Sequence, residues 1–295
     1  QLLATQHRLY ETGDKAGKIL AWLGNKEREA RWIDSVCDGK GGKYTSDEQI
    51  ASAIAEFYLN LYGADQSVDS QAVREYLQNS NLSRLSTEDR ASLDKEITLE
   101  EIQAATAGLK TGKSPGPNGL PAEIFKKYLE TLGPNLLAMF RDARDLGSLP
   151  PDLRKAIIVL IHKEGKPRDE CGSYRPISLL NVETKILASV LATRLKGVIL
   201  NLIHPDQSGF MPGRSTRLNL RRAYNWLAAV EGRQTPHLFL ALDAEKAFDR
   251  VDWSFLHQTL EVFGFGPRYR EWVRLLYHDP IAVIRVNGVT STELP

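Results

Sequence analysis

The chain has 295 residues, of which 42% are hydrophobic and 25% charged, and its formal net charge is +1 at neutral pH. This composition excludes a low-complexity or disordered protein, and the length predicts about two or three subdomains. The longest apolar run, residues 156–161, is too short to cross a membrane. Cys37 and Cys171 stand alone in the sequence, so we expect neither a zinc site nor a disulfide framework. These features favour an intracellular protein with no membrane partner.

The charges are unevenly distributed along the chain. Lysine and arginine are concentrated in residues 151–235, whereas acidic residues are concentrated before residue 105. A basic region of this kind can provide a local phosphate-binding surface on a nearly neutral protein. The chain begins with Gln1 and ends just after a strand-like run, so we expect it to be part of something longer.

The first third of the chain is predicted to be mainly helical. A polar helix is expected over residues 1–35, with a small hairpin between residues 33–37 and 43–45 around a glycine-rich turn. Ser46 begins a capping-box pattern with Gln49 and therefore opens a further helix. The polar residues 64–94 are predicted to form a linker with one short helix.

A second capping box, Thr98 with Glu101, predicts a helix over residues 99–109. The segment 108–114 superficially resembles a phosphate-binding loop. We exclude that interpretation because its two glycines are one residue too close and because a helix, not a strand, precedes them. Residues 113–119 are instead predicted to be a rigid extended loop.

The middle of the chain predicts a β-hairpin of residues 155–162 and 174–179. Lys163 and Arg175 lie near the start and the end of its long turn, so both side chains can reach one anion. A loop rich in glycine and proline is expected over residues 204–214. Helices are expected at residues 121–131, 134–146, 181–200 and 215–231.

An apolar run, residues 238–242, is predicted to be a buried strand that carries Asp243 at its C-terminal end. Phe248 follows where the chain turns towards a helix. Asp249 and Asp252 flank that helix start and are interpreted as caps. For Asp243 itself, an ordinary capping aspartate is the alternative to a metal ligand. The remaining elements are expected to be a helix ending near residue 262, a helix over residues 267–278 and a strand over residues 281–287.

Read in order, five segments resemble the reverse transcriptase domain of non-LTR (LINE-type) retrotransposons. They are Lys110–Gly119, Leu160–Lys163, Tyr174–Ser178, Gln207–Ser215 and Leu242–Asp249, and Val286–Gly288 also fits. The resemblance implies an α+β fold, with the fingers and part of the palm of a right-hand polymerase behind a mainly helical N-terminal extension. The implied boundaries are 1–94 for the extension, 95–235 for the fingers and 236–295 for the partial palm.

The resemblance implies an RNA-directed DNA polymerase that uses two Mg²⁺ ions, deoxynucleoside triphosphates, an RNA template and a DNA primer. Asp243 would be the catalytic metal-binding carboxylate, and the backbone carbonyl of Ala244 would be a further metal ligand. Phe248 would lie beneath the deoxyribose and exclude a 2′-hydroxyl group. Lys163 and Arg175 would bind the triphosphate.

Two loops would contact template or primer. The residues implied are Lys113, Gly116, Gly119, Gln207, Gly209, Phe210 and Arg214. Glycine lets a phosphate approach main-chain N–H groups closely. Tight turns that only shape the fingers are the alternative for these positions. Solvated surface charges are the alternative for Lys163 and Arg175, and a place in the core is the alternative for Phe248. Asn118 stands where the family often has aspartate.

Two-metal chemistry needs more carboxylates than Asp243 alone. In the family these lie on a later Tyr-x-Asp-Asp hairpin, which residues 277–280 do not match because Pro280 replaces the second carboxylate. We therefore expect a fragment of a reverse transcriptase, found in nucleus and cytoplasm, without polymerase activity as an isolated chain. The alternative is a non-catalytic RNA-binding or interaction module derived from such an enzyme.

Overall fold

The computed structural model describes residues 31–38, 41–63, 69–231, 233, 236–244 and 246–294. The chain divides into two compact units, each assembled from segments that are distant in the sequence. The first comprises Gln1–Phe57, Ile158–Ser178 and Val283–Thr292, and the second Tyr58–Ile157, Leu179–Ala282 and Glu293–Pro295. Most of the helix predicted for residues 1–35 lies outside the described residues, and residues 32–35 are not helical. No described helix is both long enough and apolar enough to cross a membrane.

The first unit contains the predicted small hairpin. Strands β1 (Val36–Cys37) and β2 (Lys43–Tyr44) pair antiparallel, with Val36 opposite Tyr44. The Asp38 carboxylate holds the chain between them, since it accepts bonds from the Gly42 N–H at 2.6 Å and the Tyr44 hydroxyl at 3.0 Å. Helix α3 (Asp47–Tyr62) follows, and the Ser46 hydroxyl accepts a bond from the Gln49 N–H, which is one of the two bonds of the predicted capping box.

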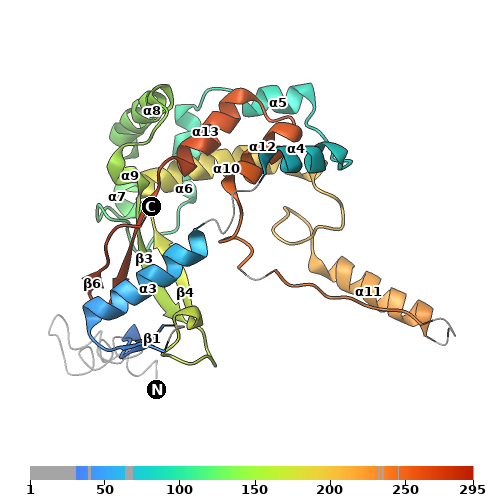
Figure 1. The fold of residues 1–295 in the computed structure, drawn as a ribbon. Coiled ribbons are helices and arrows are strands. Elements are labelled where there is room, and N and C mark those ends of the chain that lie inside the picture. Colours follow the sequence, from blue (N-terminus) through green and yellow to red (C-terminus); the bar gives the residue numbers. More distant parts are fainter. Residues whose placement is uncertain are drawn as a thin grey trace, which may run out of the picture. The chain divides into compact units, whose positions relative to one another are not determined.

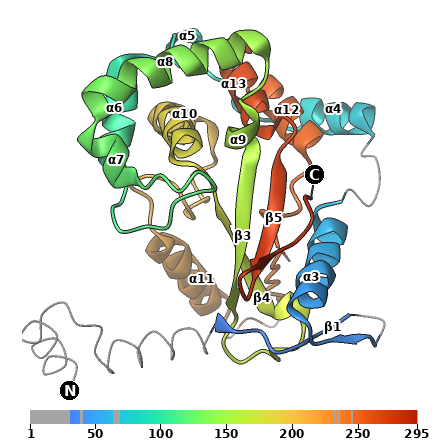
Figure 2. The ribbon, with the colours of Figure 1, turned by 90° about the vertical axis from the view of Figure 1, so that its left-hand side faces the viewer.

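A four-stranded sheet has the order β4-β3-β5-β6, and most of its residues belong to the first unit (Figures 1 and 2). The pairing of β4 with β3 confirms the predicted β-hairpin, and β5 confirms the predicted strand near the end of the chain. Its members are β3 (Lys155–His162), β4 (Tyr174–Leu179), β5 (Ile281–Val286) and β6 (Val289–Thr290).

Asn287 and Gly288 form the tight turn between β5 and β6, and both have positive φ. This is the asparagine–glycine pair that two-residue hairpin turns prefer. The Asn287 amide also bonds both backbone polar groups of Ile33 and the Asp47 carboxylate, at 2.7–3.1 Å. A residue of the Val286–Gly288 segment thus anchors the chain around Ile33 within the first unit.

The second unit is mainly helical. Its core lies between α6, α8, α10 and α13, with Phe140, Ile186 and Trp272 almost completely buried (Figure 2). Its helices are α4 (Ser70–Asn79), α5 (Thr87–Leu93), α6 (Leu99–Gly108), α7 (Ala122–Lys127), α8 (Leu129–Leu146), α9 (Pro151–Arg154), α10 (Val182–Leu202), α11 (Thr216–Val230), α12 (Trp253–Val262) and α13 (Pro267–Tyr277).

Two predictions about the helices of this unit were wrong. The supposed linker 64–94 contains two helices in its described part, α4 and α5, rather than one. Helix α8 begins at Leu129 and carries Pro134 inside it, whereas we expected the helix to begin at Pro134. The actual break is at Tyr128, whose φ of −110° and ψ of 28° lie outside the helical range.

Arg194 on α10 joins three elements of the second unit. Its guanidinium group binds both oxygens of the Glu101 carboxylate at 2.6 and 2.7 Å. It also donates to the carbonyls of Leu93, Lys95 and Glu96 at 2.6–2.9 Å. These carbonyls follow or end α5, so a single side chain satisfies groups that the helix leaves without partners.

Glu101 should make the stability of the second unit sensitive to acid. Burial alone raises the pKa of its carboxyl group, but the bonds from Arg194 and the Thr98 N–H outweigh burial and hold the pKa below the ordinary value of 4.5. A carboxyl whose pKa is lowered by folding stabilises the fold above its unfolded pKa and loses this contribution as the pH falls through the folded value.

We therefore expect the denaturation midpoint to fall below about pH 4.5, less steeply in Glu101→Gln, which keeps the cap but not the charge. Urea unfolding across the acid range measures this. Parallel curves for the two proteins would assign the acid sensitivity to other groups.

Candidate active site and nucleic-acid interface

Asp243 does not end a buried strand, so this prediction was wrong. Residues 236–244 have no regular secondary structure, and Leu242 is 86% exposed. A strand needs neighbouring N–H and C=O groups, and no described strand pairs with residues 238–242. The Asp243 carboxylate is exposed and bonds no described residue. It is therefore accessible to a ligand.

The structure brings together two aromatic side chains from different predicted groups. Phe248, the predicted sugar-contacting residue, packs edge to face against Phe210, which was predicted to contact template or primer, with ring centroids 5.7 Å apart. Both rings remain largely exposed, Phe210 at 93% and Phe248 at 80%. Phe248 is therefore not a core residue of the described chain. Phe210 has a φ of 60°, an unfavourable conformation for a bulky residue.

Lys163 and Arg175 lie in the hairpin of the first unit. The Lys163 N–H donates to the Ser173 carbonyl, and its ammonium group donates to the Gly172 carbonyl, both at 2.8 Å. An ammonium group has three N–H donors, so two of them remain available to bind an anion. Arg175 is exposed and makes no side-chain contact with a described residue. The hairpin thus holds Lys163 in a defined position and leaves Arg175 available.

The loop 113–119 is packed against the start of α10 in the second unit. A side chain at Gly116 would collide with backbone atoms of Leu180 and Asn181 and with the Asn181 amide oxygen. The fully buried Asn181 accepts from the Asn118 N–H at 3.1 Å and donates to the Asp152 carbonyl at 2.8 Å. Gly116 therefore has a packing reason to be glycine.

Other residues of this loop also have local explanations. Gly119 has a φ of 73°, which favours glycine. The Asn118 amide group donates to the Glu183 carboxylate at 3.1 Å, where an aspartate would place two carboxylates together. Lys113 is exposed and contacts no described side chain. Of the three predicted contacts in this loop, Lys113 is the one with no structural role in the second unit.

Arg214 organises the loop 204–214 from within. Its guanidinium donates to the carbonyls of His204, Gln207 and Ile203 at 2.6, 2.9 and 3.0 Å. Gln207 in turn donates to the Gly209 carbonyl at 3.3 Å. Most donors of Arg214 are therefore occupied, and the bond to Ile203 closes the C-terminal end of α10.

Replacing Arg214 with glutamine should loosen this loop. The carbonyls would lose charge-assisted bonds worth about 1.5–3 kcal/mol in typical cases, reduced where solvent can replace them. We expect faster amide hydrogen exchange across residues 203–215 and little change in α6, measured by mass spectrometry. Unchanged exchange in the loop would show that Arg214 does not hold it.

The described residues fit a magnesium ion only in part. A carboxylate and a backbone carbonyl are the oxygen ligands that Mg²⁺ accepts, and Asp243 and Ala244 offer one of each. However, no group of three or more His, Cys, Asp or Glu side chains able to hold a metal occurs among the described residues. The described part of the chain therefore does not form a complete two-metal site.

Comparison with known proteins gives a family match for the C-terminal part of the chain. Residues 161–295 match the family model described as reverse transcriptase (RNA-dependent DNA polymerase). This range contains Lys163, Arg175, Asp243 and Phe248. The chain thus carries a reverse transcriptase domain, in whole or in part.

The relatives narrow the family further. The chain is 32% identical over 281 residues to the transposon TX1 uncharacterized 149 kDa protein of Xenopus laevis. This alignment covers 95% of this chain and 21% of that protein. It is 32% identical over 204 residues to the RNA-directed DNA polymerase from mobile element jockey of Drosophila melanogaster, covering 68% and 22%. It is also 25% identical over 199 residues to the Pol polyprotein from element R2 of Popillia japonica, covering 68% and 27%.

These matches place the chain in the reverse transcriptase family of non-LTR retrotransposons. The chain spans about a fifth to a quarter of the length of these relatives.

Proposed function

We propose that the chain supplies the triphosphate-binding residues and the first metal-binding carboxylate of an RNA-directed DNA polymerase. The observation that carries the proposal is the exposure of three side chains within the matched range. Asp243, Phe248 and Arg175 are exposed and are not part of the buried core. Its substrates would be deoxynucleoside triphosphates, an RNA template and a DNA primer, which an element enzyme would meet in nucleus and cytoplasm.

Each residue would have a separate task. Lys163 and Arg175 would bind the triphosphate, an ammonium point charge and a planar guanidinium being natural partners for phosphate oxygens. Phe248 would lie beneath the deoxyribose, where its volume excludes a 2′-hydroxyl group. Phe210, packed edge to face on Phe248, would hold that ring in place. Lys113 would contact a backbone phosphate of template or primer, and Gly209 would let another approach the main chain.

Magnesium would neutralise the triphosphate and activate the attacking oxygen when bound. Asp243, with the carbonyl of Ala244, would hold one side of it. Further carboxylates are required, and by the resemblance they lie on the Tyr-x-Asp-Asp hairpin. They would be supplied by fusing this chain to a following segment that carries such a hairpin, taken from a relative such as the jockey polymerase.

The triphosphate assignment is tested in that fusion by the double substitution Lys163→Met and Arg175→Gln. Two charge-assisted contacts to phosphate are lost, so we expect kcat/KM for deoxynucleoside triphosphates to fall roughly 100-fold or more, mainly through KM. Steady-state primer extension on an RNA template measures it.

Lys166→Met is the matched control, because Lys166 lies in the same turn and its side chain contacts no described residue. It should leave KM unchanged. Equal kinetics for the double variant and the control would remove Lys163 and Arg175 from the triphosphate site.

A non-catalytic RNA-binding module is the second candidate function. It is favoured by the absence of a metal-holding group of side chains among the described residues. The fusion distinguishes the two candidates, because a chain that has lost the chemistry would bind RNA and still fail to extend a primer when the missing carboxylates are supplied.

A further inference from the structure

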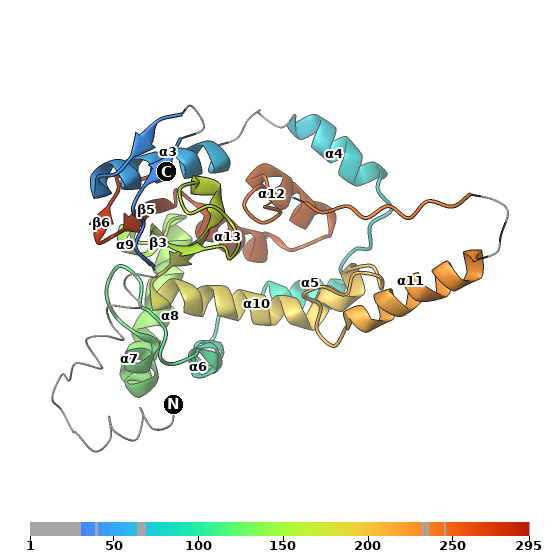
Figure 3. The same cartoon turned by 90° about the horizontal axis from the view of Figure 1, so that it is seen from below.

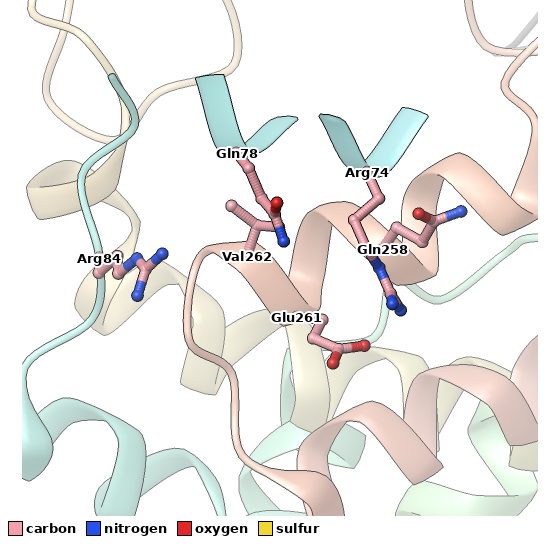
Figure 4. Close-up of a pocket in the computed structure, with 6 residues that line it drawn as sticks. All are labelled: Arg74, Gln78, Arg84, Gln258, Glu261 and Val262. Carbon is pink, nitrogen blue, oxygen red and sulfur yellow. The ribbon is translucent and has the colours of Figure 1, made fainter. Parts of the chain in front are cut away.

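Helices α4 and α12 are neighbours in the second unit (Figure 3), and a polar cleft lies between them. Its inner part has a volume of about 260 Å³. Figure 4 shows side chains from α4 and α12 extending towards each other, with Arg84 beside them; the six lining residues are Arg74, Gln78, Arg84, Gln258, Glu261 and Val262.

A wider and more open part of the cleft, of about 1040 Å³, adjoins the inner part and shares four of its lining residues. The additional side chains include Trp253, His257 and Arg274. One face of each helix provides the walls, because the lining positions are spaced three and four residues apart: 70, 71, 74, 75 and 78 on α4, and 253, 254, 257, 258 and 261 on α12.

The cleft carries an excess of free positive charge. Arg74, Arg84 and Arg274 are exposed, and none of them pairs with an acidic side chain in the described part of the chain. Of the two glutamates in the lining, Glu261 is already ion-paired with Arg270 at 3.0 Å. An anion entering the cleft would therefore meet three unpaired guanidinium groups, which suit phosphate oxygens.

The wall also carries buried polar atoms without partners. Among the described residues, His257 Nδ1 and Gln258 Oε1 are buried and form no hydrogen bond. The Gln258 amide nitrogen donates to the Ser254 hydroxyl at 3.2 Å, which orients the amide. Buried polar atoms normally have partners, so these two atoms are unsatisfied within the described fold.

An aromatic side chain stands at the rim. Trp253 is 46% exposed and packs against Tyr277, with ring centroids 5.3 Å apart. A supported indole ring that stays open to solvent is suited to stacking on a nucleobase. Burial and the positive charge of Arg274 lower the pKa of His257, which favours the neutral ring.

We propose that this cleft binds single-stranded RNA, with Arg74, Arg84 and Arg274 on consecutive phosphates and Trp253 stacked on a base. The proposal rests on the proposed function, since the strand bound would be the RNA that the polymerase copies. Phosphate contact with an unpaired base is the general pattern of sequence-tolerant single-strand recognition. None of the cleft residues belongs to the predicted nucleotide or template sites.

The test uses the complete 295-residue chain and a short fluorescent single-stranded RNA, without metal or nucleotides, so that it does not depend on polymerase chemistry. Fluorescence anisotropy is measured over a range of salt concentrations. For the double variant Arg74→Gln/Arg84→Gln we expect affinity to fall roughly 10-fold or more. The slope of log K against log salt should become shallower by about 1.4, since each phosphate contact on a single strand contributes about 0.7.

Arg90→Gln is the matched control. Arg90 is also exposed, on α5, and its side chain contacts no described residue and does not line the cleft. It should leave affinity and slope nearly unchanged. Trp253→Leu should weaken binding roughly 10-fold without changing the salt slope, because stacking releases no counterions. Thermal unfolding confirms that each variant remains folded.

Three results would overturn the proposal. The double variant binding RNA with the affinity and salt slope of the wild type would show that the cleft arginines serve something else. Failure of the wild-type chain to bind RNA would also overturn the cleft proposal. The polymerase proposal would then still be tested separately by the primer-extension assay. Displacement of the RNA by uridine monophosphate at comparable concentration would assign the cleft to a free nucleotide instead of a strand.

Discussion

Replacing Asp243 with asparagine should reduce RNA-templated primer extension by roughly 10³-fold in the fusion that supplies the remaining carboxylates. The amide keeps the shape of the side chain and removes the negative charge that would hold magnesium. A bound metal supplies several kcal/mol of charge stabilisation, and each 1.36 kcal/mol corresponds to a factor of ten in rate. Single-turnover extension at saturating nucleotide measures the chemical step.

The matched control for this substitution is Asp249→Asn. Asp249 is in the same turn region, and its N–H bonds the Lys246 carbonyl, so the backbone there does not depend on its carboxylate. The variant should keep most of the activity. Because Asp243 is exposed and bonds no described residue, Asp243→Asn should unfold at the same temperature as the wild type. An active Asp243→Asn enzyme would remove the carboxylate from the metal site.

Replacing Gly116 with alanine should produce the largest loss of stability. The new methyl group would collide with the backbone of Leu180 and Asn181, which cannot move away as a flexible side chain would. Overpacking against such a rigid neighbour costs about 3 kcal/mol. The collision would also disturb the buried Asn181, whose amide ties the loop to Asp152.

Gly197→Ala on α10 is the control for this prediction. Outside the local backbone of α10, no atom lies within 4 Å of the position where its methyl group would be, and its φ is not positive. Alanine is favoured over glycine inside a helix, so this variant should gain about 0.5–1 kcal/mol. Chemical unfolding of both variants measures the difference. Equal stability for Gly116→Ala and the wild type would show that packing against α10 does not require glycine at position 116.

Local signals in the sequence predicted local structure well. The Thr98–Glu101 pattern predicted the start of α6, where both capping-box bonds are formed. Asp252 was predicted as a cap, and its carboxylate accepts the Phe255 N–H at 2.7 Å. These interactions span only three residues, so a short stretch of sequence contains everything that they need.

Contacts between distant residues could not be predicted in this way. The Asp94 carboxylate accepts the Tyr269 N–H at 2.8 Å and thereby caps α13, although Gly266 at its N-cap offers no side chain. Arg194 and Asn287 likewise bond residues about 90 to 250 positions away. Nothing in the sequence around these polar residues indicates which partner the fold provides.

The wrong prediction of a strand at residues 238–242 also has a non-local cause. The run is apolar enough for a buried strand, but its secondary structure depends on neighbouring strands that the described residues do not supply. The site residues Asp243 and Phe248 were identified through resemblance, and their roles stay predictions. The cleft between α4 and α12 was missed because its arginines and polar side chains look like ordinary solvated helix faces when each helix is considered alone.

We infer that this chain belongs to an enzyme that copies RNA into DNA. The most direct measurement incubates the fusion protein with a primed RNA of mixed sequence, all four deoxynucleoside triphosphates and Mg²⁺, and then sequences the product. We predict DNA complementary to the RNA, formed by the fusion and absent with the isolated chain. A fusion product that does not depend on the RNA template, or no product at all, would overturn this inference. Extension by the isolated chain would instead overturn the expectation that further carboxylates are required.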